Sequence, residues 1–220
     1  MLAPPTAATV IAFGDSLVDG METTPDADAP WPSALARRLA AHPDLPPRAV
    51  INMGISGNRV LRETDGMGAS ALARFDRDVL ARPGARWIIL FEGVNDMLFG
   101  LMPGMPESQR ATASDIITGY RMLIARAHLH DLRIVGCTLL PIGGAPVFTP
   151  ELGDLRQQVN RWIRDSGEFD AVTDLDAALR DPAAPTRMPA ELLSDDGVHP
   201  NDAGHTAIAE VFDLGLFRER

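Results

Sequence analysis

The chain has 220 residues, 45% of them hydrophobic, so it can bury a substantial core, and its length favours one domain over two. It carries 30 acidic and 20 basic residues, and the net charge of −10 argues against a nucleic-acid or anionic-membrane partner, since both need clustered lysine and arginine. A single cysteine, Cys137, excludes an internal disulfide framework. We therefore expect one domain over residues 1–220.

Apolar, β-branched runs recur along the chain and predict five strands. Helix-like stretches separate these runs, and such alternation is typical of βαβ units with a parallel sheet. The predicted strands are Thr9–Phe13, Ala49–Asn52, Trp87–Phe91, Arg133–Leu139 and Ala171–Leu175.

Apolar spacing of three and four residues predicts the helices between the strands. They are Ser33–Ala41, a stretch around Leu72, Phe75 and Val79, Ser114–His128, a stripe from Leu152 to Ile163 that Gly167 ends, and Ala203–Phe212. Arg74 and Arg77 are interpreted as part of a solvated helix face. Two segments rich in Gly and Pro, Leu98–Arg110 and Pro141–Pro150, are predicted to be loops.

Glycine-containing turns follow the first three strands, where an open parallel sheet binds its ligands. They are Gly14-Asp15-Ser16, Gly54-Ile55-Ser56-Gly57-Asn58 and Gly93-Val94-Asn95-Asp96, and a late block, Asp196-Gly197-Val198-His199, follows far along the chain. Glycine lets the backbone approach a carbonyl closely. The turns therefore predict one site at this edge of the sheet.

The residue types in these blocks suit serine chemistry. The Ser16 hydroxyl is a weak nucleophile until an imidazole such as His199 takes its proton. Asp196 lies three residues before His199, a spacing that can bring a carboxylate to the ring from one loop, although Asp195 competes for that role. The Asn95 amide can donate to an oxyanion, whereas Asp96 is interpreted as a local turn acceptor.

The four blocks, in this order, resemble those of the SGNH (GDSL) hydrolase family, and the resemblance covers nearly the whole chain. It implies a flavodoxin-like three-layer α/β/α fold, a five-stranded parallel sheet and ester hydrolysis without a cofactor. Carried over by position, Ser16 is the nucleophile and Asp196 with His199 completes the triad. Gly57 and Asn95 join the Ser16 N–H in the oxyanion hole, and no metal is implied.

Several alternatives stay open for the substrate, which we expect to be a small-molecule or carbohydrate ester. A short-chain carboxylesterase is preferred because nothing indicates a long acyl tunnel; a carbohydrate O-acetylesterase and a thioesterase or lysophospholipase are the other choices. The segments Ile55–Leu61 and Ala73–Leu80 are similar to a bacterial branch of the family described as aryl- or carbohydrate esterases. From another class, the chain could be a catalytically silent carbohydrate-binding module.

Three further expectations concern the surroundings of the site. The segments Leu98–Arg110 and Pro141–Pro150 flank the catalytic edge, either as an acyl pocket or lid, or as covers of the core. The Pro- and Ala-rich segment Asp176–Ser194 precedes the His199 loop, so its folding decides where His199 lies. No membrane insertion is expected, and the chain as written is cytoplasmic unless an export signal has been removed; the oligomeric state is not predicted.

Overall fold

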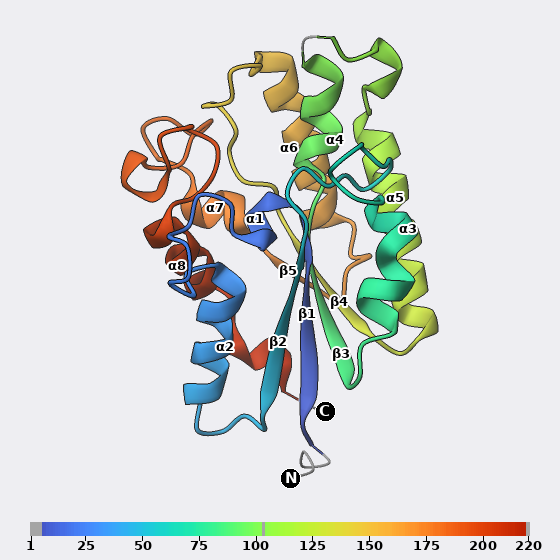
Figure 1. The fold of residues 1–220 in the computed structure, drawn as a ribbon, viewed down its shortest axis with the longest axis vertical. Coiled ribbons are helices and arrows are strands. Elements are labelled where there is room, and N and C mark those ends of the chain that lie inside the picture. The colour runs from blue at the N-terminus through green and yellow to red at the C-terminus, as the bar shows by residue number, and fades with distance from the viewer. Residues whose placement is uncertain (1–5, 103, 219–220) are drawn as a thin grey trace.

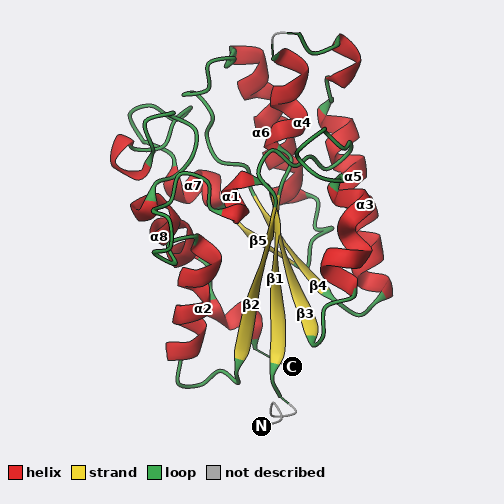
Figure 2. Ribbon diagram, viewed as in Figure 1, coloured by secondary structure: helices red, strands yellow, loops and turns green. Residues whose placement is uncertain are grey.

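A five-stranded sheet forms the centre of the computed structural model, which describes residues 6–102 and 104–218 (Figures 1 and 2). All strand pairs are parallel, and the order across the sheet is β2-β1-β3-β4-β5. The strands are β1 (Ala8–Gly14), β2 (Arg48–Gly54), β3 (Ala85–Phe91), β4 (Arg133–Cys137) and β5 (Ala171–Thr173). The five predicted strands are thereby confirmed.

Helices cover both faces of the sheet, which gives the expected three-layer α/β/α arrangement (Figure 1). Longer helices form the layers: α2 and α8 pack together on one face, and α3, α5 and α6 lie on the other. Their bounds are α2 (Trp31–Ala41), α3 (Ala71–Phe75), α5 (Ala113–Leu129), α6 (Pro150–Asp165) and α8 (Asp202–Val211).

Because both faces are covered, the inner strands can be apolar along their whole length. All seven residues of β1 are buried, and Phe13 at its end packs edge-on against Phe75 of α3 at 5.6 Å. On the other face, Trp31 stacks on Phe212 at 5.2 Å, next to α8. Cys137 is buried at the end of β4.

Shorter elements account for most differences from the sequence-based expectation. A helix of four or five residues shows no repeat of the apolar period, so periodicity does not reveal it. These elements are α1 (Ser16–Asp19), a π-helical turn η1 (Asp76–Leu80), α4 (Val94–Leu98), α7 (Leu175–Leu179) and the 3₁₀ turns η2 (Phe99–Leu101), η3 (Glu107–Gln109), η4 (Ala190–Leu192) and η5 (Leu214–Phe217). The predicted loop 98–110 therefore contains helical turns.

Cap chemistry sets the ends of the longer helices. Thr112 and Asp115 form a reciprocal capping box at the start of α5, and Thr149 caps α6 ahead of Pro150. Asn201 accepts the N–H of Gly204 and begins α8. Gly167, just after α6, has φ 68°, as its interpretation as a left-handed cap requires.

The carboxyl ends of β1 and β3 approach each other closely. A Cβ atom on Gly14 would lie 1.9 Å from the Phe91 carbonyl oxygen, so only glycine fits at this position. This close approach brings the turns after β1 and β3 to the same edge of the sheet, where Ser16 and Asn95 lie.

Among the described residues, no helix has both the length and the apolar character needed to cross a lipid bilayer.

Candidate active site

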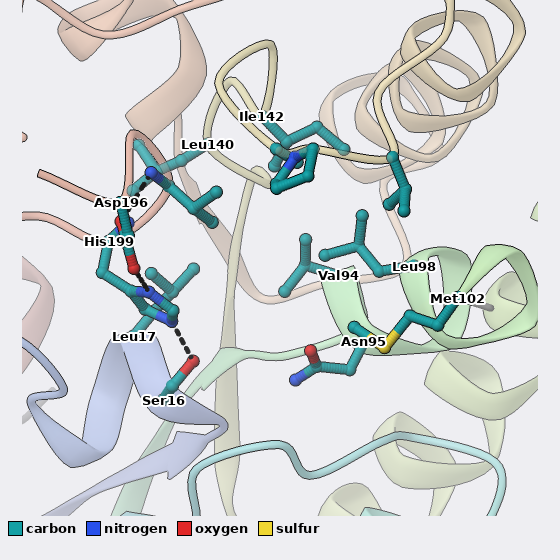
Figure 3. A pocket seen from close by; sticks show the side chains of 14 residues that line it. Ser16, Leu17, Val94, Asn95, Leu98, Met102, Leu140, Ile142, Asp196 and His199 are labelled. Carbon is teal, nitrogen blue, oxygen red and sulfur yellow. Dashed lines mark hydrogen bonds and ion pairs between the residues drawn. The ribbon is translucent and has the colours of Figure 1, made fainter.

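Ser16 begins the short helix α1 just after β1, and only 4% of Ser16 is exposed to solvent. Asp15 precedes it and caps this helix, because the Asp15 Oδ1 atom accepts the N–H of Leu17 at 2.9 Å. The tight turn between the strand and the helix leaves the Ser16 hydroxyl facing a cavity, as Figure 3 shows.

His199 and Asp196 lie next to Ser16, although 183 residues separate Ser16 from His199. The Ser16 Oγ atom is 2.9 Å from His199 Nε2, and His199 Nδ1 is 2.5 Å from Asp196 Oδ2 (Figure 3). With the carboxylate on Nδ1, the proton of a neutral imidazole belongs there, and Nε2 is free to accept from the serine hydroxyl. The arrangement is that of a nucleophile, a base and an orienting acid.

The loop that carries Asp196 is held by its own carboxylate. Asp196 Oδ1 accepts the N–H groups of Val198 and His199 and the hydroxyl of Ser194, each at 2.8 Å. Partial burial alone would raise the pKa of Asp196, but the hydrogen bonds from His199, Val198 and Ser194 outweigh it and lower the pKa to about 2. Asp196 is therefore ionised near neutral pH. Because Asp196 makes the contact with the His199 ring, Asp195 is not the partner of His199.

The Pro- and Ala-rich segment before this loop is folded against the rest of the chain. Leu193 and Pro200 form an antiparallel bridge, and the Asn201 N–H donates to Leu192 O at 3.1 Å. The loop is also closed by the Ser194 N–H, which donates to His199 O at 2.9 Å. These bonds fix the position of His199 beside Ser16.

Of the two other predicted oxyanion donors, the structure brings Asn95 to the cavity. Asn95 lies in the first turn of α4, its Nδ2 atom donates to Asn58 O at 2.9 Å, and its amide faces Ser16 across the cavity (Figure 3). Gly57 lies in the adjoining turn, beside Asn58, and does not itself line the cavity. Its φ of 78°, and the Met67 sulfur 2.3 Å from where a Cβ would be, require glycine here.

Asp96, on α4, binds the backbone that follows the turn after β2. Its carboxylate accepts the N–H groups of Val60 at 2.7 Å and Leu61 at 3.0 Å, more than 30 residues away, so the interpretation as a local turn acceptor is wrong. Burial raises the pKa of Asp96 to about 6, and the two N–H donors offset part of that effect. Asp96 thus joins the turn after β2 to α4.

Arg74 is buried, and the prediction that it lies on a solvated helix face is wrong for it. Its side chain is 0% exposed, whereas that of Arg77 is 66% exposed. The guanidinium donates to four oxygens in this part of the fold: Gly14 O at 2.8 Å, Met53 O at 2.8 Å, Asn58 Oδ1 at 2.9 Å and Asp78 Oδ2 at 3.2 Å. Glu92 Oε2 lies 3.6 Å from the same group.

Two signals in the sequence could have identified these buried residues. Arg74 and Asp78 are four apart, a spacing at which helical side chains pair, and Phe75 beside Arg74 belongs to the apolar stripe. Glu92 directly follows the apolar run of β3, where a charged residue is costly unless it is paired or neutral. Neither signal by itself separates a buried network from a surface pair.

Other acidic and histidine side chains of similar chemistry do not join the triad. Asp15 does not join Asp196 and His199, because its carboxylate faces Leu17 and Glu92. His128 contacts Asp170 at 3.0 Å on the surface, and His205 is buried where its Nδ1 accepts the Trp31 N–H at 3.2 Å. Burial lowers the pKa of His205 to about 4, so it stays neutral.

The cavity beside Ser16 has a volume of about 470 Å³. Both predicted flanking segments contribute to it: Leu98 and Met102 from one, and Ile142 with Ala145, Pro146 and Val147 from the other. Among the described residues that line it, the only polar ones are Ser16, Asn95, Asp196 and His199. The remaining lining residues are Leu17, Val94, Leu98, Met102, Leu140, Ile142, Ala145, Pro146, Val147 and Val198.

Comparisons with known proteins agree with this arrangement. The model of the GDSL-like lipase/acylhydrolase family matches residues 12–207. No curated protein sequence was found to match the chain.

Solved structures share the fold at low sequence identity. A variant of Axe2, an acetyl xylan esterase from Geobacillus stearothermophilus, is 24% identical with a TM-score of 0.71, covering 93% of this chain and 92% of its own. The acetyl xylan esterase AlAXEase is 23% identical with a TM-score of 0.70, over 92% and 96% of the two chains. LAE5, an alpha/beta hydrolase enzyme from the metagenome of Lake Arreo, Spain, is 19% identical with a TM-score of 0.71, over 99% of each chain.

The buried position of Arg74 predicts a large cost for its removal. We expect Arg74→Met to lower the free energy of unfolding by about 3–5 kcal/mol, because buried carboxylates and carbonyls lose their cation. Arg37→Met, on α2, removes an exposed arginine whose ion-pair partner, Asp28, is also exposed, so it is the matched control and should stay near wild-type stability. Urea unfolding followed by circular dichroism measures both; equal losses in the two variants would contradict this role of Arg74.

Proposed function

This chain belongs to the GDSL-like lipase/acylhydrolase family and is a carboxylic ester hydrolase, and from that premise we propose that it hydrolyses short-chain esters through an acyl-enzyme on Ser16. The observation that carries the proposal is the contact of Ser16 Oγ with His199 Nε2 at 2.9 Å, with Asp196 on the other ring nitrogen. A serine with such partners is activated, whereas an isolated serine is not.

Acylation begins when Ser16 Oγ attacks the ester carbonyl carbon and its proton passes to His199 Nε2. Asp196 stabilises the imidazolium that forms and holds the ring in the required orientation. When the tetrahedral intermediate collapses, the C–O bond to the alcohol breaks and His199 gives its proton to the departing oxygen. The acyl group is then bound to Ser16.

Deacylation repeats these steps with water as the nucleophile. His199 takes a proton from the water as its oxygen attacks the acyl carbon, and then returns a proton to Ser16 Oγ as the acid leaves. In both steps the negative oxygen receives hydrogen bonds from the Ser16 N–H and from Asn95 Nδ2, two residues that line the cavity; the Gly57 N–H, from the adjoining turn, is the third donor that the family resemblance implies. Such donors, fixed before the reaction, stabilise charge without reorganising.

The composition of the cavity supports an ester with an apolar acyl group. The described residues that line it offer no polar side chain beyond the four reactive ones, so sugar hydroxyls would lose hydrogen bonds with water there without replacement. Its volume of about 470 Å³ exceeds the need of an acetyl group and falls within the range of ordinary small-molecule sites. The carbohydrate O-acetylesterase alternative, suggested by what Axe2 and AlAXEase act on, therefore ranks second.

Replacing the nucleophile tests the proposal most directly. Ser16→Ala should lower kcat for p-nitrophenyl acetate by at least about 1000-fold and abolish labelling by a fluorophosphonate, since both need the hydroxyl. Circular dichroism should remain that of the wild type. Wild-type turnover in this variant would show that another residue is the nucleophile, and an unlabelled wild-type protein would favour the silent binding module.

Asn95 allows a test of the oxyanion donors. Asn95→Ala should lower kcat about 100- to 1000-fold with little change in KM, because the amide acts on the charge that develops in the transition state. Asn52→Ala is the matched control: its amide also bonds to backbone oxygens, of Val18 and Asp19, but lies outside the cavity, so kcat should hardly change. Equal effects of the two substitutions would remove Asn95 from the catalytic set.

The apolar cavity predicts how rate depends on acyl length. From p-nitrophenyl acetate to hexanoate, kcat/KM should rise by up to about fourfold per methylene, the equivalent of about 0.8 kcal/mol of burial, and then level off. Ala145→Leu, which fills part of the cavity, should depress the longer esters more than acetate, while Ala40→Leu on the exposed face of α2 should not. Faster hydrolysis of acetylated xylan than of any aryl ester would favour the carbohydrate alternative.

A further inference from the structure

Two carboxyl groups lie in contact beneath the nucleophile turn. Asp15 and Glu92 are 0% and 1% exposed, and they directly follow Gly14 and Phe91, which are register partners on the neighbouring strands β1 and β3, so the two carboxyl groups adjoin. Asp15 Oδ1 already accepts the Leu17 N–H, so Asp15 Oδ2 is the oxygen available to Glu92. Two adjoining buried carboxylates would repel each other and leave these oxygens without donors, whereas a single proton lets one group donate to the other, so one of the two carries a hydrogen.

Glu92 has few other partners. Among the described residues, no N–H or O–H group outside the pair makes a well-aligned hydrogen bond to either of its oxygens. The nearest cationic atom, Arg74 Nη2, is 3.6 Å away, and the same atom donates to Gly14 O at 2.8 Å. A buried carboxylate with so few donors would be costly, whereas a carboxylic acid needs only one acceptor.

The charges around Glu92 also favour its neutral form. The ionisable side chains of the described residues that face it are Asp15 before α1, Arg74 on α3, Asp96 on α4 and Tyr120 on α5. Burial keeps the Tyr120 phenol neutral, and its hydroxyl donates to Glu92 O at 2.5 Å. Arg74 is thus the one cation in this set and is shared with Asp78. Burial, and then the charge of Asp15, raises the pKa of Glu92 well above its usual value. Burial also raises the pKa of Asp15, to about 7, but the Leu17 N–H favours the ionised form of Asp15, so Glu92 is the better holder of the proton.

We propose that Glu92 is a neutral carboxylic acid that donates its O–H to Asp15 Oδ2, and that this pair positions the Ser16 turn. Asp15 then receives a hydrogen bond on each oxygen, from Glu92 and from the Leu17 N–H, and its orientation is fixed. The fixed Asp15 carboxylate holds the peptide between Ser16 and Leu17 from below. It thereby sets the direction of the Ser16 hydroxyl and N–H. The catalytic part of this inference rests on the proposed role of Ser16; the protonation of Glu92 does not.

The pair has a consequence at alkaline pH. When Glu92 loses its proton, a second negative charge appears beside Asp15, below the place where the oxyanion forms, and turnover falls. The folded protein also loses stability, because the pKa of Glu92 is raised by folding. The stabilisation that Glu92 contributes is complete below its pKa in the unfolded chain, about 4.3, and is lost as the pH rises through its pKa in the folded protein.

Glu92→Gln and Glu92→Leu separate the hydrogen bond from the charge. Glutamine keeps a donor for Asp15 and cannot ionise, whereas leucine removes the donor at similar size. We expect the Tm of Glu92→Gln to exceed that of the wild type by a margin that grows as the pH is raised from 5 to 9. The infrared difference spectrum of wild type minus Glu92→Gln at neutral pH should contain the carbonyl stretching band of a protonated carboxylic acid.

Activity tests the positioning role. With p-nitrophenyl acetate, kcat of Glu92→Gln should stay within about threefold of the wild type at neutral pH and lose the alkaline decline, while Glu92→Leu should fall about 10- to 100-fold. Leu39→Ala, on the buried face of α2, is the control for a general loss of stability and should leave kcat nearly unchanged. If Glu92→Leu does not fold, the Tm and infrared comparison of Glu92→Gln with the wild type decides the protonation.

Several results would overturn the inference. A Glu92→Gln variant that becomes less stable than the wild type as the pH rises would make Glu92 an ionised partner of Arg74, as would the absence of the infrared band. A Glu92→Gln variant as slow as Glu92→Leu would reject the positioning role. These outcomes are independent of Ser16→Ala, whose retained turnover would instead refute the proposed nucleophile.

Discussion

The guanidinium of Arg74 is the constraint on which the site depends. It is fully buried and donates to carbonyls at the ends of two neighbouring strands, Gly14 O of β1 and Met53 O of β2, and to the side chain of Asn58. A buried cation of this kind is stable only where several oxygens surround it. The ends of β1 and β2 and the turn after β2 therefore converge on one side chain from α3, and the groups around the reaction centre share that anchor.

The site above this anchor combines a polar base with an apolar cavity. Below Ser16 and Asn95 lie the buried carboxyl groups of Asp15, Glu92 and Asp96; Asp15 and Asp96 accept backbone N–H groups, and Glu92 adjoins Asp15. Apart from the four reactive residues, the part of the cavity wall that the structure describes is apolar. Buried polar groups that are fully paired hold a turn in one conformation, whereas an apolar wall strengthens the fixed dipoles that act on a developing charge.

Much of the fold was predictable from local patterns, and the failures have physical reasons. Five apolar runs predicted five strands because a sheet covered on both faces needs apolar residues throughout. Helix α1 was missed because four residues contain no period, although its cap Asp15 and its first residue Ser16 were both identified as a turn. Arg74 was assigned to the surface because arginine on a helix is usually solvated, and nothing in the sequence states which oxygens another segment will bring to it.

The sequence alone determined the residue types of the site, their order, and their places at strand ends, because an alternation of strands and helices brings the carboxyl ends of parallel strands to one edge. It left open whether the segment before His199 would bring the imidazole to Ser16 and which of Asp195 and Asp196 would reach that ring, and it did not indicate that Asp15, Glu92 and Asp96 would be buried. Only the tertiary structure decided these points. Each depends on distances between segments far apart in the chain, and on the loss of water around groups whose burial no local pattern records.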